Sequence, residues 1–327
     1  MNIIITGSNG FIGKTLLNKL LNEYPQANIT CLVRSPKNSV NERVKNVTVN
    51  YLDLNSIIQS DAIKDVDYIF HVAGVTKSAT KKRFWEGNVI PVQNLVAAVK
   101  QTNNNLKRFI NVSSQAASGP SKSVNHYKTE TEPDTPSELY GASKLAGEMI
   151  LRSQMEIPYT IINPGGVYGP GDVDFLKIFK MTKMGLNVYA GVKEKYISLI
   201  YAEDLVDAIV DAAFLENTIN KKYFIVDDKP FTWQQIHEEV FSIAGKKHFD
   251  INIPLPVISF LANFGSLYSV ISKKESILNK NKIDLSRPSF WIASNEAAKK
   301  DFGFKTKYSI RTSLEKTYNW YLDKGWL

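Results

Sequence analysis

The fold is decided by the opening stretch Met1-Asn-Ile-Ile-Ile-Thr6-Gly7-Ser8-Asn9-Gly10-Phe11-Ile12-Gly13. An apolar strand runs into a turn with glycines at positions 7, 10 and 13, and a helical pattern follows. Glycines at this spacing permit a tight turn, a close approach of the backbone to a pyrophosphate, and close packing of the helix on the sheet. The helix N-terminus then faces the phosphates. The stretch predicts a dinucleotide cradle, and a strand-to-helix turn without a ligand is the alternative.

Beyond this turn, strand-like apolar runs alternate with helical patterns through the first half of the chain. This alternation predicts an α/β fold, a doubly wound parallel sheet that binds ligands at the carboxyl ends of its strands. The expected strands are 3–6, 29–33, 47–51, 68–71, 108–112 and 159–163, and the expected helices are 12–22, 84–101 and 137–154, with a turn after Asn55.

The rhythm changes at a cluster of glycines and prolines, Pro164-Gly-Gly-Val-Tyr-Gly-Pro-Gly171. Such a cluster predicts a loop that enters a second, smaller and mainly helical region. We therefore expect a dinucleotide-binding domain at 1–171, to which the chain returns over about 194–226. The return would consist of a strand of the sheet at 196–201, a helix at 202–214 and a further strand at 222–226. Residues of about 172–193 and 227–327 would form a substrate-binding cap.

Composition and charge narrow the class of protein. The chain has 327 residues and a net charge of +8, but its lysines are scattered and accompany no nucleic-acid-binding motif, so no nucleic-acid partner is expected. The single cysteine, Cys31, lies in an apolar run and indicates a reducing compartment. Because no signal segment precedes the first strand, we expect a cytoplasmic protein. The uncharged stretch 251–272 contains prolines and polar residues, which favours a buried or interfacial helix over a membrane span.

A second motif, Tyr140-Gly-Ala-Ser-Lys144, predicts a proton donor. Tyr140 and Lys144 lie four residues apart in an expected helix, so their side chains project from one face. A nearby ammonium is expected to lower the tyrosine pKa from about 10 toward neutrality, as an alcohol–ketone pair requires. Ser114 follows the fifth strand, where its hydroxyl would reach a substrate oxygen. The alternatives are an exposed helix face and a serine that caps a turn.

Taken together, these motifs resemble the extended short-chain dehydrogenase/reductase superfamily of the NAD(P)-dependent epimerase/dehydratase type. The resemblance covers nearly the whole chain. Within the superfamily, the C-terminal pattern around Trp291, Ala297-Ala298 and Trp320-Tyr321 is closer to 3β-hydroxysteroid dehydrogenase-like and dihydroflavonol reductase-like members. The motifs that carry it are Thr6–Gly13, Asp53-Leu54, His71-Val-Ala73-Gly74, Asn88-Val, Val112-Ser-Ser114, Tyr140–Lys144, Pro164-Gly-Gly-Val-Tyr168-Gly-Pro and Tyr201-Ala-Glu-Asp204-Leu.

The resemblance implies a catalytic role for four residues. Tyr140 would exchange the proton, and Lys144 would hold the nicotinamide ribose while tuning Tyr140. Ser114 would orient the reacting oxygen, and Asn88 would support the site from the helix behind it. His71 is expected to be a packed residue rather than a catalyst. No metal is implied.

The resemblance also assigns cofactor contacts, and it implies a homodimer through the helices at 84–101 and 137–154. Asp53 would meet the adenine amino group, and the backbone of Ala73 and Gly74 would line the cofactor. Two departures, Gln115 and Asn163, bear on substrate identity rather than on hydride transfer. The cofactor residues are Gly7, Ser8, Asn9, Gly10, Phe11, Ile12, Gly13, Arg34, Lys37, Asp53, Leu54, Ala73, Gly74, Tyr140, Lys144, Pro164, Gly165 and Val167.

Cofactor choice depends on the end of the second strand. An acidic residue there would bind the adenosine ribose hydroxyls and repel a 2′-phosphate. No Asp or Glu occurs between Tyr24 and Asn41, whereas Arg34 and Lys37 supply two cations. Because an arginine fork suits a phosphate, NADP(H) is the expected cofactor. NAD(H) is the alternative, in which Arg34 stacks on adenine without discriminating.

The leading functional hypothesis is an NAD(P)-dependent oxidoreductase that interconverts a secondary alcohol and a ketone on a small, partly apolar substrate. The apolar stripe within 254–272 would line its pocket, or would only pack the cap. The alternative enzyme is a nucleotide-sugar epimerase or dehydratase with tightly bound NAD, in which Arg287 would contact a pyrophosphate. A sensing or scaffolding protein is a third reading, which the presence of Tyr140, Lys144 and Ser114 disfavours.

Overall fold

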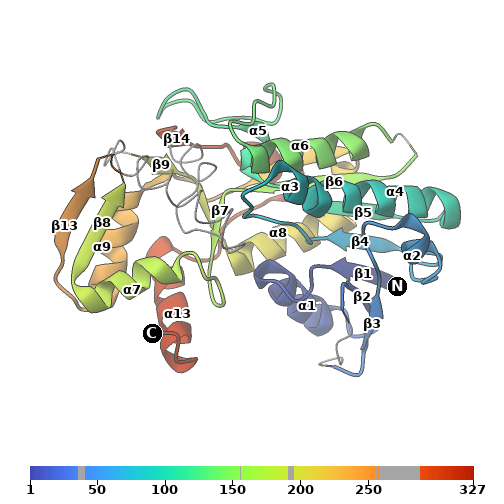
Figure 1. The fold of residues 1–327 in the computed structure, drawn as a ribbon, viewed down its shortest axis with the longest axis horizontal. Coiled ribbons are helices and arrows are strands. Elements are labelled where there is room, and N and C mark those ends of the chain that lie inside the picture. Colours follow the sequence, from blue (N-terminus) through green and yellow to red (C-terminus); the bar gives the residue numbers. More distant parts are fainter. Residues whose placement is uncertain (36–40, 155, 191–194, 255–256, 258–287) are drawn as a thin grey trace.

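The main body of the protein is a seven-stranded parallel sheet with the order β11-β6-β5-β4-β1-β2-β3 (Figure 1). This computed structural model describes residues 1–35, 41–154, 156–190, 195–254, 257 and 288–327. The predicted doubly wound sheet is confirmed. Its strands are β1 (Asn2–Thr6), β2 (Asn28–Val33), β3 (Val44–Thr48), β4 (Tyr68–His71), β5 (Arg108–Val112), β6 (Tyr159–Pro164) and β11 (Lys221–Ile225).

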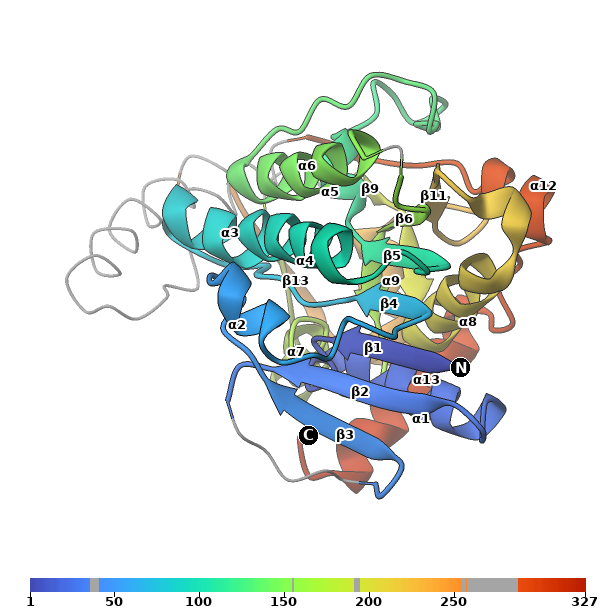
Figure 2. The same ribbon diagram turned by 90° about the vertical axis from the view of Figure 1, so that its right-hand side faces the viewer.

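Helices cover both faces of the sheet (Figure 2). On one face, α1 (Phe11–Glu23) and α8 (Ala202–Phe214) contact each other and bury leucines such as Leu16, Leu20 and Leu205 in one core. On the other face lies a second core that includes Leu95 and Leu151. The helices of that face are α2 (Leu54–Ile58), α3 (Lys81–Asn88), α4 (Ile90–Thr102) and α6 (Leu139–Arg152), and the short α5 (Gln115–Ser118) packs against α6.

A smaller body lies beside one end of the sheet (Figure 1). It has its own aromatic core, in which Phe179 and Tyr321 are fully buried with ring centroids 5.2 Å apart. The helix α12 (Glu296–Phe302), although it falls within the stretch expected in the cap, contacts β11 of the main sheet. The smaller body comprises α7 (Leu176–Met184), β8 (Leu186–Ala190), α9 (Trp233–Ile243), β13 (Phe249–Ile253) and α13 (Ile310–Asp323).

The expectation that residues 196–201 return to the main sheet is wrong. β10 (Leu199–Tyr201) pairs instead with β7 (Gly166–Tyr168) in a separate two-stranded sheet. β9 (Tyr196–Ile197) pairs with β12 (Phe231–Thr232) and β14 (Phe290–Trp291). The cause lies at Gly165, where an added Cβ would approach the Ser198 carbonyl oxygen to 2.4 Å. This close approach lets the 198–201 segment follow β7 away from the sheet.

Two other expected elements differ from the structure. The helix expected at 84–101 is two helices separated at Val89, whose φ of −109° departs from the usual helical value. Pro91 opens α4, where its missing N–H costs nothing. The strand expected at 47–51 begins three residues earlier, because Val49 and Tyr51 are buried in the turn beyond β3 rather than in the strand.

Within the described ranges, none of the helices combines the length and apolar character needed to cross a bilayer. Most of the uncharged stretch 251–272, including the apolar stripe from Ile258 onward, lies outside the described residues, as does Arg287.

Candidate active site

The turn after β1 is packed so closely that Gly7 and Gly13 cannot be replaced without displacing backbone. Gly7 has a φ of +73°, and a Cβ on it would lie 2.7 Å from the Ala73 amide nitrogen. A Cβ on Gly13 would lie 2.1 Å from the Gly7 carbonyl oxygen. Gly10 is the N-cap of α1, and a Cβ on it would lie 3.2 Å from the Gly7 carbonyl oxygen. The turn therefore exposes backbone amides and the N-terminus of α1, which together suit a pyrophosphate.

A cleft of about 870 Å³ opens from this turn along the carboxyl ends of the central strands. The cleft is large enough to hold a dinucleotide, so its size and its lining residues both fit this class of cofactor. Seven of the predicted cofactor residues line it: Gly7, Ser8, Asn9, Gly10, Arg34, Ala73 and Gly74. Residues that the sequence analysis did not single out also line it, among them Asn50, Tyr51, Leu52, Ser56, Arg83 and Glu86.

Other predicted cofactor residues lie behind or beside this lining. Asp53 is exposed and is the N-cap of α2, where its Oδ1 accepts a hydrogen bond from the Asn55 amide at 3.0 Å. Lys37 lies outside the described residues. Phe11, Ile12 and Gly13 belong to α1, Leu54 to α2, Pro164 to β6 and Val167 to β7, and Gly165 joins the last two strands.

Tyr140, Ser114 and Lys144 come together next to the cleft. The side chain of Ser114 lies beside the phenol of Tyr140, where it acts on the Tyr140 pKa as a hydrogen-bond partner. Lys144, one helical turn further along α6, is buried, and its Nζ donates to the Val112 carbonyl oxygen at 2.7 Å. Lys144 Nζ would lie 3.6 Å from a Cβ placed on Gly74, which lines the cleft. The phenol of Tyr140, which is the predicted proton donor, thus lies with the Ser114 hydroxyl and the Lys144 ammonium at one edge of the predicted dinucleotide site.

The expected fall in the Tyr140 pKa is not found in this arrangement. Burial raises the pKa of Tyr140 to about 12, which the hydrogen bond from Ser114 opposes and the Glu138 carboxylate reinforces. Burial lowers the pKa of Lys144 to about 8, and the Glu148 carboxylate acts in the opposite direction. Both shifts favour the neutral form, because desolvation disfavours a charge on either group. Tyr140 is therefore protonated at neutral pH.

Asn88 and His71 hold the surroundings in place. Asn88 is buried, its Oδ1 accepts from the Val75 amide at 2.7 Å, and its Nδ2 donates to the Ser143 hydroxyl at 2.8 Å. The fully buried His71 interacts through Nδ1 with the Thr6 hydroxyl at 2.8 Å. Burial, reinforced by Lys144, lowers the pKa of His71 to about 3, so the ring is uncharged. As expected, His71 is a packed residue.

The family follows from a comparison with known proteins. A model described as the NAD dependent epimerase/dehydratase family matches residues 3–224, more than half of the chain. The chain belongs to this family. Its members are NAD-dependent epimerases, dehydratases and dehydrogenases of the extended short-chain type, and the resemblance stated from the motifs is confirmed.

Individual members of the epimerase/dehydratase family match over nearly the whole chain. A ceramide reductase from Caulobacter vibrioides is 26% identical, with 99% of this chain and 96% of the relative covered. A 3 beta-hydroxysteroid dehydrogenase/Delta 5-->4-isomerase from Monkeypox virus is 23% identical, with 97% of each chain covered. The solved UDP-glucuronic acid 4-epimerase from Bacillus cereus, in complex with UDP-glucuronic acid and NAD, has a TM-score of 0.78 at 20% identity and covers 99% of this chain and 100% of its own.

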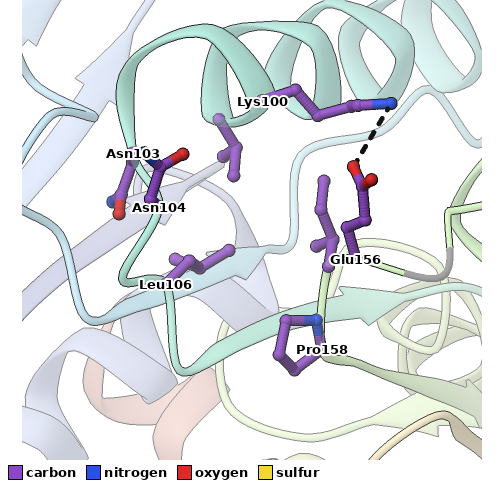
Figure 3. A pocket seen from close by; sticks show the side chains of 8 residues that line it. Lys100, Asn103, Asn104, Leu106, Glu156 and Pro158 are labelled. Atoms are coloured by element: carbon purple, nitrogen blue, oxygen red, sulfur yellow. Dashed lines mark ion pairs between the residues drawn. The ribbon is translucent and has the colours of Figure 1, made fainter.

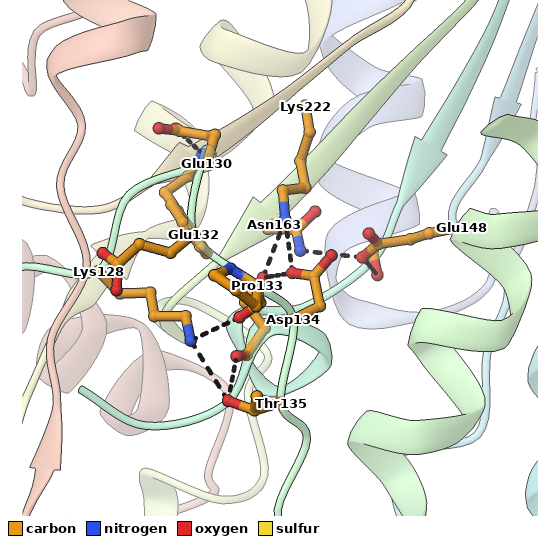
Figure 4. Close-up of polar contacts among 12 residues, drawn as sticks. Lys128, Glu130, Glu132, Pro133, Asp134, Thr135, Glu148, Asn163 and Lys222 are labelled. Atoms are coloured by element: carbon orange, nitrogen blue, oxygen red, sulfur yellow. Dashed lines mark hydrogen bonds and ion pairs between the residues drawn. The ribbon is translucent and has the colours of Figure 1, made fainter. Parts of the chain in front are cut away.

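A buried polar network behind the predicted catalytic residues was not predicted from the sequence of this family member. Glu148 has no exposed surface, and its Oε1 accepts from the Ser113 hydroxyl at 2.5 Å and from Asn163 Nδ2 at 2.9 Å. Figure 4 shows the Asn163 amide directed at this carboxylate, and Asp134 directed at Lys222. Lys222 Nζ and Asp134 Oδ1 are 2.7 Å apart. The available signal was a glutamate on the same helical face as Tyr140 and Lys144, eight residues after the tyrosine.

A smaller pocket of about 330 Å³, whose lining residues Figure 3 shows, lies at the opposite ends of the strands from the cleft. It is formed by the end of α4 and the residues that precede β5 and β6, including Leu106 and Pro158. Lys100 Nζ and Glu156 Oε2 are 3.7 Å apart across it. Ligands of doubly wound folds bind at the carboxyl ends of the strands. This pocket lies at the amino ends and contains none of the predicted site residues.

Proposed function

We propose that the protein is an NAD(P)-dependent oxidoreductase that interconverts a secondary alcohol and a ketone, with Tyr140 as the proton donor and acceptor. The observation that carries this proposal is the placement of Ser114 beside Tyr140, with Lys144 one turn along the helix and the dinucleotide cleft alongside. A hydroxyl that orients an oxygen and a phenol that protonates it are what carbonyl reduction requires.

In this proposal the bound nicotinamide supplies or accepts the hydride. The Ser114 hydroxyl donates a hydrogen bond to the substrate oxygen and holds it near the phenol. In the reducing direction Tyr140 transfers its Oη proton to the oxygen, and its raised pKa keeps that proton available at neutral pH. The phenolate that results is stabilised by the Lys144 ammonium. In the oxidising direction the same groups act in reverse, and the phenolate accepts the alcohol proton.

We propose NADP(H) as the preferred cofactor, with NAD(H) as the alternative. Arg34 is exposed, immediately follows β2 and lines the cleft, where a 2′-phosphate would meet its forked donors. The adjoining sequence from Tyr24 to Asn41 contains no carboxylate that would repel a phosphate. The family is NAD-dependent, and the solved epimerase holds NAD, so this preference is a departure that needs its own test.

The substrate that we propose is small and partly apolar. The ceramide reductase and the hydroxysteroid dehydrogenase, whose names describe apolar substrates, support it. The alternative substrate is a nucleotide sugar, turned over by an epimerase or dehydratase with tightly bound NAD. It is supported by the likeness in fold to the UDP-glucuronic acid 4-epimerase. A cytoplasmic location and a homodimer through α4 and α6 complete the proposal.

The test combines a ligand screen with Tyr140→Phe. Purified protein is assayed for reduction of apolar ketones, including β-keto and steroid-like compounds, and for binding of uridine and thymidine diphosphates. Tyr140→Phe is expected to lower kcat for the active ketone by about 10²–10⁴-fold, the usual contribution of a proton donor. Cofactor affinity should change less than about twofold, because the phenol acts on the substrate.

Two results would contradict the proposal. A Tyr140→Phe protein that kept most of its reductase rate would show that Tyr140 is not the donor. Tight diphosphate binding together with C4 epimerisation or dehydration, and no ketone reduction, would establish the nucleotide-sugar alternative.

A further inference from the structure

We propose that Glu148 is a positioning residue whose buried negative charge, one helical turn beyond Lys144, keeps the Lys144 ammonium charged next to the catalytic site. The inference rests on the proposed function, since it concerns how that site works. Tyr140, Lys144 and Glu148 follow one another at intervals of four residues in α6, so they occupy successive turns of one helical face. Lys144 and Glu148 are both buried, so a cation and an anion occupy neighbouring turns of the helix away from solvent.

The carboxylate of Glu148 is held by donors from three elements. Ser113 at the end of β5 and Asn163 in β6 both donate to Oε1, at 2.5 and 2.9 Å. Arg152 in α6 donates to Oε2 at 2.6 Å. Burial raises the pKa of Glu148 above its usual range, although these contacts oppose the rise. We infer that the carboxylate is ionised, because it forms an ion pair with Arg152 and each hydrogen bond favours the charged form.

The charges beyond Glu148 are satisfied among themselves. Arg152 also contacts Asp134, with NH1 and Oδ2 3.0 Å apart, and Asp134 in turn pairs with Lys222 at 2.7 Å (Figure 4). NH1 of Arg152 and Nζ of Lys222 therefore bind the two oxygens of the same Asp134 carboxylate. Glu148 lies between this outer cluster and Lys144, so its negative charge acts on Lys144 from the side opposite Tyr140.

The other groups near Lys144 leave this role to Glu148. His71 of β4 is uncharged because burial lowers its pKa to about 3. The Val112 carbonyl oxygen of β5 accepts a hydrogen bond from the Lys144 ammonium. The side-chain amide of Asn88, from α3, and the Lys144 ammonium both lie close to Gly74. Arg83 and Glu86 of α3 are on the wall of the cleft, and Glu138 accepts hydrogen bonds from the first amides of α6. The carboxylate that raises the Lys144 pKa is Glu148.

The experiment compares Glu148→Gln with Asp134→Asn across pH. Both variants remove one negative charge and keep the side-chain shape, but only Glu148 contacts the groups around Lys144. The pH dependence of kcat/KM for ketone reduction and of NADPH and NADH binding is measured for both variants and for the wild type. Glu148→Gln is expected to move the alkaline limb of the profiles down by about one pH unit, a tenfold change in the Lys144 proton equilibrium. Asp134→Asn should leave the limb within about 0.3 unit.

A purely structural role would give a different result. If Glu148→Gln lowered the rate equally at every pH and left the limb in place, the proposal would be overturned. If that variant did not fold, Ser113→Ala would decide, since losing its short hydrogen bond favours protonation of Glu148. It should move the limb in the same direction by a smaller amount, and an unmoved limb would refute the role.

The cofactor-binding profiles separate this inference from the proposed function. Should the wild type reduce no ketone, the proposed reaction would fail. The pH dependence of NADPH and NADH binding would still show whether Glu148 controls the charge of Lys144.

Discussion

At Gly7 and Gly13 of the glycine turn, backbone atoms leave no space for a Cβ, whereas at the ends of β2 and β3 exposed side chains line the same cleft. A Cβ on Gly13 would lie 2.1 Å from a carbonyl oxygen. At the other end, Arg34 is exposed and the Leu52 side chain is 48% exposed. The shape of the cleft at the glycine turn is therefore fixed by close backbone packing. At the ends of β2 and β3 it is formed by exposed side chains, which can be replaced without disturbing the core.

This difference separates two properties of the cofactor site. Backbone amides and a helix N-terminus bind a pyrophosphate whatever nucleotide carries it. The adenosine end distinguishes a free 2′-hydroxyl from a 2′-phosphate by the charge of a few exposed groups. Changes in the turn should consequently affect folding and all dinucleotides together, whereas changes at the adenosine end should affect the choice between them.

The largest effect is expected from Gly13→Ala. The new methyl group would meet Gly7 and Ser8 backbone atoms at 2.1 to 2.9 Å, and backbone cannot move aside as a flexible side chain can. We expect a loss of about 3 kcal/mol in the free energy of unfolding, measured by chemical denaturation, because the overpacking displaces the turn. NADH and NADPH should both bind at least about a hundredfold more weakly.

Gly10→Ala is the control within the same turn. Gly10 has a φ of −79°, which any residue adopts, and a Cβ there would meet only the Gly7 oxygen at 3.2 Å. Its unfolding free energy should fall by less than about 1 kcal/mol. Equal destabilisation by the two alanines would show that the turn is not limited by packing at Gly13.

The sequence predicted the central sheet well because burial there is continuous. β4 and β5, and the helix α8, begin and end at the predicted residues, since the two strands are buried over nearly their whole length and α8 buries most of its apolar residues. The edge strand β3 was misplaced, because its Lys45 and Asn46 give it little apolar pattern. The pairing of the 196–201 segment was predicted wrongly for a different reason. It depends on a close backbone contact at Gly165, which no local pattern reveals.

The candidate site was predictable where spacing alone brings residues together. Tyr140 and Lys144 share a helical face, and Ser114 ends a neighbouring strand. The pKa of Tyr140 was predicted in the wrong direction, because burial outweighs the opposing contact with Ser114. Glu148 was missed because its partners, Ser113 and Asn163, come from two strands far away in the sequence.

Arg34→Ala should alter the choice of cofactor without altering stability. Loss of one charge-assisted phosphate contact costs about 1.5–3 kcal/mol, so the ratio of NADPH to NADH affinity should fall by about ten- to a hundredfold. Titration of wild type and variant with both cofactors measures this ratio. Arg83→Ala, which removes the arginine on the α3 side of the cleft, serves as the control and should weaken both cofactors alike. Tighter binding of NADH than NADPH by the wild type would remove the case for an NADP preference.

The smallest effect is expected at Asp53, where one residue has a structural and a predicted binding role. Oδ1 caps α2 through the Asn55 amide, which leaves Oδ2 to accept a hydrogen bond from the adenine amino group. Asp53→Ala removes both contacts and should cost about 1 kcal/mol of stability, the usual value of an N-cap, together with a few-fold loss of cofactor affinity. Asp53→Asn retains an oxygen for the cap but turns the second acceptor into an amide donor. Calorimetric titration and thermal unfolding of this variant should therefore show unchanged stability and the same few-fold loss for NADH and NADPH. If Asp53→Asn bound both cofactors as the wild type does, Asp53 would be a helix cap alone, and the adenosine end would depend on Arg34 and the apolar wall around Leu52.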